Sequence, residues 1–282
     1  MTGFGRKVAR WCLGGMLTAL PVSAWSDEPA GTPPVLRVCA DPNNLPFSNQ
    51  AGEGFENRLA ALLAKSLGMT LDYTWHAQRR GFLRETLNAG LCDVVMGLPS
   101  RDDKALTTRP YYRSSYVLVY PTARGYRIRS LDDPKLKRLR IGVHLAGDKS
   151  SPPALALARR GIIDNVVGYS VYGDYGKASP PLQLVDGVAQ GDIDVAVAWG
   201  PAAGYFAGKT PAGLTLVPLA DDRRNKLPFV FSISLGVRKS DKLLKSRLDA
   251  ALDRNRDAIA ALLDGYHVPR TDPRHKPASF NH

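Results

Sequence analysis

The order of its apolar segments constrains the fold of this 282-residue chain more than any other feature. Strand-like and helix-like runs alternate as β-α-β-α-β between residues 35 and 97, and the same order returns between residues 139 and 199. This alternation predicts parallel sheets with crossover helices. Two further β-rich runs, 114–121 and 229–237, are interpreted as crossings between two α/β lobes. We therefore expect an α/β fold in which a two-strand hinge joins two lobes around a cleft.

The loop after the first strand is the first candidate for a wall of that cleft. The apolar run 35–40 ends at Asp41-Pro42, where proline removes a backbone donor and disfavours helix at the residue before it. Ligands of open α/β sheets bind at the carboxyl ends of such strands, although turn formation explains the same residue types without a ligand. Asp41 and Glu56 are a candidate acid/base pair, with complementation of the helix dipole by Glu56 as the alternative.

Residues 1–24 have the organisation of a secretory signal peptide. Three cations at residues 6–10 precede an apolar run at 11–20, and small residues suited to cleavage end at Ala24. The apolar run is about half of the roughly 20 residues that cross a bilayer. We expect cleavage of residues 1–24, export of the rest to the periplasm, and no membrane-spanning segment.

The charge balance points to an acidic partner. The formal net charge is +12, and it falls to +9 without the three cations of the signal peptide. An excess of Lys and Arg favours an acidic partner or an anionic surface. Because the chain is expected to be exported, nucleic acid is not a candidate partner.

Two cysteines remain after the signal peptide. Cys39 lies in the first predicted strand, and Cys92 lies immediately before the apolar strand 93–97. An oxidising compartment favours a bond between them, and adjacent parallel strands would bring the two sulfurs together. We predict a structural disulfide, with two buried free thiols as the alternative.

Motifs for catalysis are missing from the sequence. It contains no Gly-x-Ser-x-Gly nucleophile elbow, no Walker-type phosphate loop and no Cys-x-x-Cys-His haem site. The five histidines show no spacing typical of metal ligands. We therefore expect no enzyme activity, no cofactor and no metal.

Several segments, in order, resemble a known family. The Asp-Pro-Asn-Asn-Leu-Pro-Phe order at 41–47 and Gly-Phe-Glu-Asn at 54–57 are similar to the opening of family-3 extracellular solute-binding proteins. Segments 75–82, 92–97, 106–113 and 198–201 resemble the narrower MxaJ/XoxJ type, which is associated with quinoprotein methanol dehydrogenases. The resemblance runs from residue 35 to about residue 268. It implies a type II periplasmic-binding-protein fold.

From the resemblance and the two crossings, we expect lobe 1 at 33–121 plus 229–270, lobe 2 at 122–228, and a flexible tail at 271–282. Amino-acid-binding members of the family hold the substrate carboxylate with an arginine, to which Arg101 is the nearest counterpart here. They hold the ammonium with an aspartate, and Trp199 stands at that position. Asp148 replaces part of the turn that grips the anion. The resemblance therefore implies that the α-amino-acid site is lost.

The resemblance implies a non-enzymatic periplasmic protein that assists maturation or activation of a PQQ-dependent methanol dehydrogenase, with its cytochrome c as a further partner, and that acts as a monomer. The alternatives are the receptor of an ABC transporter for a solute other than an α-amino acid, and a dehydratase-type enzyme on the same fold. The predicted cleft residues are Asp41, Asn44, Phe47, Glu56, Trp75, Gln78, Arg79, Arg101, Tyr111, Tyr112, Arg113, Trp199 and Tyr205.

Overall fold

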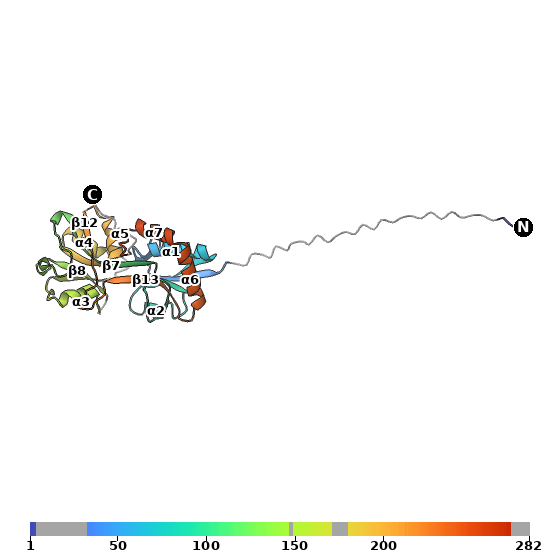
Figure 1. Cartoon of the computed structure of the whole chain (residues 1–282), viewed down its shortest axis with the longest axis horizontal. Coiled ribbons are helices and arrows are strands. Elements are labelled where there is room, and N and C mark those ends of the chain that lie inside the picture. The colour runs from blue at the N-terminus through green and yellow to red at the C-terminus, as the bar shows by residue number, and fades with distance from the viewer. Residues whose placement is uncertain (4–32, 147–148, 171–179, 212, 272–282) are drawn as a thin grey trace. The chain divides into compact units, whose positions relative to one another are not determined.

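The computed structural model of the chain describes residues 1–3, 33–146, 149–170, 180–211 and 213–271. The described residues from Pro33 onward form one compact unit, and its centre is a mixed sheet of 11 strands. The main path of the sheet runs in the order β10 (Val166–Ser170), β8 (Ile141–Ala146), β11 (Val195–Trp199), β7 (Tyr112–Pro121), β13 (Val230–Val237), β5 (Val94–Pro99), β1 (Val35–Ala40) and β4 (Thr70–Trp75). This is the expected α/β class (Figure 1).

Short strands complete the sheet at its margins. β12 (Leu214–Pro218) pairs with β7, β6 (Leu106–Thr107) pairs with β13, and β9 (Lys149–Ser150) pairs with β8. A separate hairpin of β2 (Asn43–Asn44) and β3 (Ser48–Asn49) lies in the loop after β1.

The first half of the sheet, which we define as β1, β4 and β5, has the predicted parallel pairing. β1 pairs in parallel with β4 on one side and with β5 on the other. One face packs against α1 (Phe55–Leu67), α6 (Lys242–Arg254) and α7 (Arg256–Gly265) around a core that includes Phe55, Leu59 and Leu63. The other face carries the smaller cluster of Cys39, Cys92 and their apolar neighbours. Each face therefore buries one alternate set of strand residues.

The second half of the sheet, defined as β8, β10 and β11, repeats this arrangement. β8 pairs in parallel with both β10 and β11. Apolar residues of α3 (Pro152–Ala158) belong to one buried cluster, and those of α4 (Leu182–Gln190) and α5 (Gly200–Ala207) belong to another. Two faces covered by helices are typical of a parallel sheet.

β7 and β13 connect the two halves, as the β-rich runs predicted. β13 pairs with β7 through residues 230–233 and with β5 through residues 233–236, both antiparallel. β7 uses its later residues, 116–119, to pair with β11. Figure 1 shows the two strands side by side between the α3 and α4 side of the unit and the α1 and α6 side.

Two predicted helices differ from the structure. The helix expected at 80–89 is only α2 (Phe82–Glu85), because the Thr86 hydroxyl donates to the Phe82 carbonyl and the chain then turns to bury Leu87. The single helix expected from 240 to 265 is broken at Asn255, whose side-chain amide donates to Ser66 Oγ and to the Ala251 carbonyl. Side-chain hydrogen bonds of this kind compete with helical ones.

Other expectations concern parts of the chain that are not described. Residues 4–24 of the predicted signal peptide, Asp148 and residues 272–282 of the predicted tail lie outside the described residues. No helix among the residues that the structure describes has the length and apolar content to cross a membrane. The peptide bond between Leu45 and Pro46 is cis.

Candidate functional site

Asp41 fixes the loops that follow β1 and β4. One of its carboxylate oxygens accepts from the Asn43 N–H at 2.8 Å, and the other accepts from the Gln78 N–H at 2.7 Å. The Asn44 side-chain amide donates to Gln78 Oε1 at 3.2 Å, and Ser48 Oγ donates to the Asp41 carbonyl at 2.8 Å. Asp41 therefore holds the two loops together at the carboxyl edge of the sheet.

The entry of helix α1 is set by a close approach between Gly54 and Phe47. A Cβ at Gly54 would overlap the Phe47 carbonyl and the following amide, so only glycine fits there. Asn57 Oδ1 caps the helix by accepting from the Gly54 N–H at 3.1 Å and from the Asn49 N–H at 3.0 Å. The Glu56 N–H donates to the Phe47 carbonyl at 2.9 Å. These contacts fix the position from which the Glu56 side chain extends.

A cavity of about 190 Å³ opens between these loops and the central strands. Its walls come from the loops after β1 and β4, the start of α1, and strands β5, β7, β11 and β13. It is lined by Asn44, Phe47, Glu56, Gln78, Gly97, Tyr112, Trp199 and Ile233. The cavity lies where ligands of α/β sheets bind, at the carboxyl ends of parallel strands. Six of the predicted cleft residues meet in it.

Glu56 is the one acidic residue in this lining. The residue is 8% exposed, and burial raises the pKa of its carboxyl to about 8. The carboxyl lies directly over Gly97, where a Cβ would overlap Glu56 Oε1. Burial, with a smaller contribution from the Glu56 charge, also raises the pKa of Tyr111 and Tyr112. Burial in the cavity therefore favours the protonated form of this carboxyl.

Trp199 provides an aromatic wall from the second half of the sheet. It ends β11 and directly precedes α5, so its position follows from the register of β11 with β7, where Trp199 faces Tyr116. Its ring meets the rings of Tyr116 and Phe231 edge to face, with centroids 5.4 and 5.8 Å apart. Such contacts hold the indole in one orientation.

The other predicted cleft residues lie elsewhere. Trp75 stacks on Tyr73 with ring centroids 4.6 Å apart, and the Tyr111 hydroxyl donates to the Met96 carbonyl at 3.0 Å. Tyr205 lines a separate hollow of about 570 Å³ beside Lys209, whose ammonium donates to the Tyr205 hydroxyl at 2.6 Å. The exposed members are Arg79, Arg101 and Arg113. None of these six residues lines the 190 Å³ cavity, and neither does Asp41, the seventh predicted residue outside it.

Two lining residues, Gly97 and Ile233, were not predicted. Both lie within apolar strands, and nothing in an apolar run distinguishes a residue that faces a cavity from one that faces the core. For Gly97, a glycine inside a strand was the available signal, since such a residue often marks a close approach of another group.

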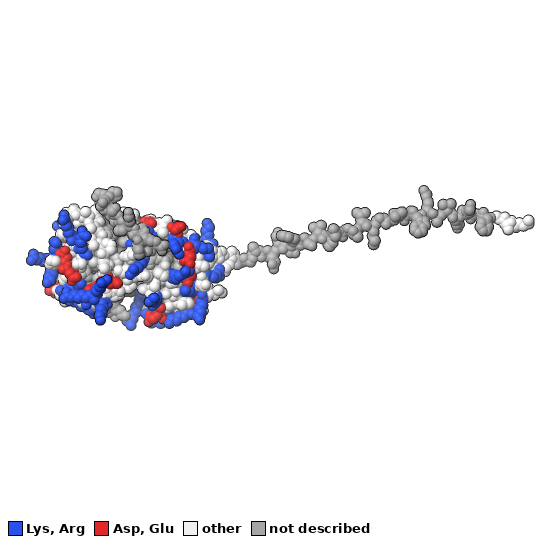
Figure 2. Space-filling view, in the orientation of Figure 1, with Lys and Arg blue, Asp and Glu red and all other residues white. Residues whose placement is uncertain are grey.

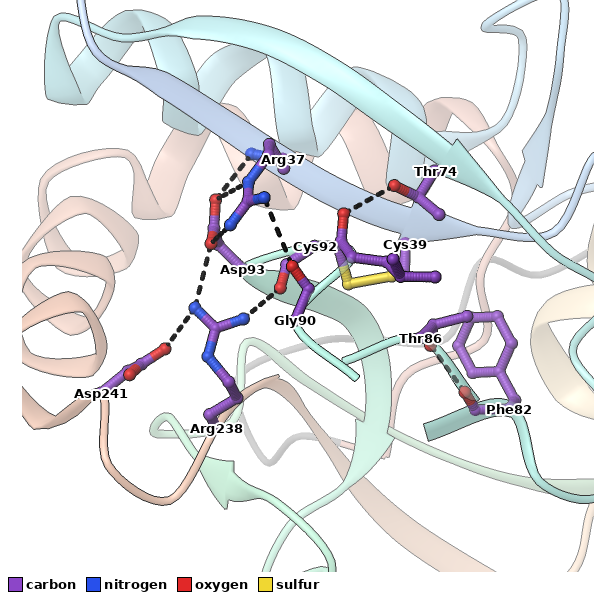
Figure 3. The surroundings of a disulfide bond; sticks show 11 residues. Arg37, Cys39, Thr74, Phe82, Thr86, Gly90, Cys92, Asp93, Arg238 and Asp241 are labelled. Atoms are coloured by element: carbon purple, nitrogen blue, oxygen red, sulfur yellow. Dashed lines mark hydrogen bonds and ion pairs between the residues drawn. A yellow bond between two sulfur atoms is a disulfide. The ribbon is translucent and has the colours of Figure 1, made fainter. Parts of the chain in front are cut away.

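The disulfide lies beneath the strand that carries the Asp41 loop. Cys39 and Cys92 are bonded with their Cα atoms 5.5 Å apart, which confirms the predicted pair. Beside it, the Asp93 carboxylate accepts from the Arg37 guanidinium at 2.7 Å and from the Arg238 guanidinium at 3.0 Å (Figure 3). These charges lower the pKa of Asp93, against the opposing effect of burial. The network joins β1, β5 and the segment after β13, and so stabilises one wall of the cavity.

The surface is basic and the described residues offer no metal site. Figure 2 shows Lys and Arg side chains scattered across the visible face, with fewer Asp and Glu between them. Among the described residues, no three of His, Cys, Asp or Glu gather in a way that would hold a metal ion. The site therefore consists of a small cavity with one buried acid and aromatic walls, set in a positively charged surface.

Comparison with known proteins adds a relationship that geometry alone does not give. Residues 36–267 match the bacterial extracellular solute-binding proteins, family 3. Protein MoxJ of Methylorubrum extorquens is 33% identical over 253 residues, which cover 85% of this chain and 82% of MoxJ. The structure of periplasmic binding protein XoxJ from Methylobacterium extorquens AM1 is 34% identical with a TM-score of 0.70, over 84% of this chain and 99% of XoxJ. MxaJ from Methlophaga aminisulfidivorans MPT is 28% identical with a TM-score of 0.74, over 83% and 99% of the two chains.

Proposed function

Because the chain belongs to the family-3 bacterial extracellular solute-binding proteins, and within them to the MxaJ/XoxJ type, we propose that it is a non-enzymatic periplasmic binding protein that assists a PQQ-dependent methanol dehydrogenase. The observation that carries this proposal is the similarity to MoxJ and XoxJ over more than four fifths of the chain. The assistance consists of maturation or activation of the dehydrogenase, through binding of the enzyme or a peptide of it.

The proposal includes two lobes that move about β7 and β13. Lobe 1 comprises 33–121 and 229–270, lobe 2 comprises 122–228, residues 1–24 are removed on export, and residues 271–282 are a flexible tail. The separate apolar clusters of the two sheet halves support this division, since each half has a core of its own. A partner peptide would enter between the lobes, against the Asp41 loop and Trp199.

The positive surface favours an acidic partner over a free amino acid. Fixed charges on the two molecules speed their encounter and orient it. Trp199 lines the cavity, at the position where the resemblance implies an aspartate in amino-acid-binding relatives, and Arg101 is exposed rather than in the lining. An α-amino acid would therefore find neither of its usual charge partners, which supports a role other than amino-acid uptake.

The test is binding between the mature chain and the purified methanol dehydrogenase of the same organism, with and without its cytochrome c. We expect a saturable complex that weakens as salt rises, because the attraction is electrostatic. Trp199→Ala should weaken capture if the cleft is used, with Trp75→Ala as the matched control, since Trp75 lies outside the cavity. Absence of a complex at low salt, together with normal dehydrogenase activation in a strain lacking this gene, would contradict the proposal.

The buried acid in the cavity favours a second candidate function, in which the protein is the receptor that delivers a small solute to an ABC transporter. A ligand that binds only the folded state raises the thermal stability of the protein. A screen of small solutes by thermal shift separates the two candidates, because the dehydrogenase role requires no small ligand.

An enzyme of the dehydratase type would need Glu56 for proton transfer, but among the described lining residues Glu56 has no second acid or base beside it.

A further inference from the structure

We propose that the 190 Å³ cavity binds a small organic cation, such as an alkylammonium or guanidinium ion, with Glu56 as its counter-ion. The cavity shares Trp199 with the cleft proposed above for a partner peptide, but its test uses small cations alone and does not depend on binding of the dehydrogenase. It gives the small-solute candidate a definite chemical class of ligand.

The first support is the isolation of the Glu56 carboxyl. It is more than nine-tenths buried, and no residue within the described part of the chain donates a hydrogen bond to it or pairs with its charge. The titratable groups that interact with it are Tyr73, Tyr111 and Tyr112, all of them neutral at physiological pH. A buried carboxyl without a partner costs free energy, and a ligand that supplied the missing partner would recover it.

The second support is the charge of the lining. The described residues around the cavity include one acid and no Lys, Arg or His. An anion, or the carboxylate of an α-amino acid, would have no cation to meet and would face Glu56. A cation meets one carboxylate and two side-chain amides, those of Asn44 and Gln78, whose carbonyl oxygens accept hydrogen bonds.

The third support is the aromatic content of the walls. Phe47, Tyr112 and Trp199 line the cavity, and aromatic rings attract ammonium and guanidinium groups by cation–π interaction. Glu56 is the second residue of the 13-residue helix α1, whose amino end favours a negative charge. A bound cation would therefore restore the carboxylate form of Glu56 in a place that already suits an anion.

The size of the cavity limits the ligand to a few heavy atoms. Sites for drug-sized ligands occupy about 300–1,000 Å³, and this cavity has about 190 Å³. Gly97 contributes to that space, because a Cβ there would displace the Glu56 carboxyl. Methylammonium, tetramethylammonium and guanidinium are probes of suitable size.

The experiment is isothermal titration of the full mature chain with those three chloride salts, and with tert-butanol as an uncharged analogue of tetramethylammonium. We expect saturable binding of at least one cation, with none detected for tert-butanol at the same concentrations. Binding near pH 7 should release close to one proton, seen as a difference in heat between phosphate and HEPES buffers, because the cation ionises Glu56.

Variants identify the counter-ion. Glu56→Gln should weaken binding at least tenfold and abolish proton release, whereas Glu53→Gln, which removes an exposed acid of the same loop, should leave both unchanged. Gly97→Ala keeps the charge but displaces the carboxyl, so it should also weaken binding. Circular dichroism establishes that each variant is folded. Failure of all three cations to bind the folded wild-type chain, or equal affinity of Glu56→Gln, would overturn the proposal.

Discussion

The two halves of the sheet hold an aspartate in the same way at corresponding places. Asp93 precedes β5 and accepts from the backbone N–H of Arg37, whose carbonyl accepts from Asp93 in return. Asp194 precedes β11 and makes the same exchange with Arg140. In each half the guanidinium also donates to the carbonyl of the glycine three residues before the aspartate, and that glycine has a positive φ. The same arrangement of hydrogen bonds thus joins neighbouring parallel strands in both halves.

The first half adds contacts that have no counterpart among the described residues of the second half. Arg238 approaches Asp93 as a second cation, donates to the Cys92 carbonyl and pairs with Asp241 at 2.7 Å (Figure 3). The disulfide fastens Cys92 to β1 in the same place. Within the described residues of the second half, Asp194 pairs with Arg140 alone, with 3.6 Å between carboxylate and guanidinium. The segment that leads from β13 to α6 is therefore fastened to the first half at this aspartate.

The disulfide is the largest expected difference between the halves. Its closed loop spans 53 residues of sequence separation, for which the chain-entropy relation gives about 4 kcal/mol of stabilisation. Replacing both Cys39 and Cys92 with alanine should lower the free energy of unfolding by about that amount. Chemical denaturation of the two forms measures it. An unchanged midpoint would mean that the Arg37–Asp93–Arg238 network alone secures this half.

Buried titratable groups give the halves opposite responses to pH. Glu56 has its pKa raised to about 8, so its contribution to stability is complete below about pH 4.5 and is lost as the pH rises through 8. His144 on β8 has its pKa lowered to about 4 by burial, and no described residue hydrogen-bonds to its Nε2. Its contribution is complete above about pH 6.5 and is lost as the pH falls through 4.

Single substitutions separate these two responses. In the wild-type chain, the free energy of unfolding should fall by about 3 kcal/mol between pH 5 and 8 through Glu56, and by about 2 kcal/mol from pH 7.5 to pH 5 through His144. Glu56→Gln should abolish the first decrease, and His144→Gln should abolish the second. Urea denaturation across the pH range measures both. If each variant kept the pH profile of the wild-type chain, the assignment of the slopes to these residues would be wrong.

Asp93 and Asp194 give the smallest expected difference between the two halves. Asp93→Ala leaves two guanidinium groups without their acceptor and should cost about 2–3 kcal/mol, because hydrogen bonds to charged groups are at stake. Asp194→Ala affects one arginine whose side chain is 54% exposed, and should cost about 1 kcal/mol. Melting curves of the two variants give the order. Equal losses would show that Arg238 adds nothing to this site.

Much of the fold could be predicted because, in most segments, the hydrophobic periodicity agrees with the positions of the glycine and proline residues that end strands and helices. The apolar run before Asp41 and the alternation of apolar and polar residues in β4 each predicted a strand, and both segments are strands. Helix α5 was not predicted, since it begins at Gly200 and carries a second glycine, Gly204, in its interior, and glycine is a poor signal for a helix. The reason for Gly204 lies far away in the sequence: a Cβ there would overlap the carbonyl of His267. Packing of this kind has no local signature.

The candidate site was predictable where its residues lie in loops and much less so in strands. Asn44, Phe47 and Glu56 follow a strand end and were expected at the cleft, and all three line the cavity. Arg101 was expected at the cleft as the nearest counterpart of the family's carboxylate-binding arginine, but its N–H donates to Thr107 Oγ1 and its side chain is exposed. Counting residues along a loop does not fix the direction in which the loop turns.

The position of β13 has a consequence for how the molecule is made. The strand lies between β5 and β7, yet it is synthesised long after both of them. Until residues 230–237 emerge, facing edges of β5 and β7 lack their partner, and unpaired strand edges attract other chains. The middle of the sheet is therefore completed only when the last fifth of the polypeptide has arrived. A chain that stops before residue 230 would yield an aggregation-prone fragment rather than a smaller working protein.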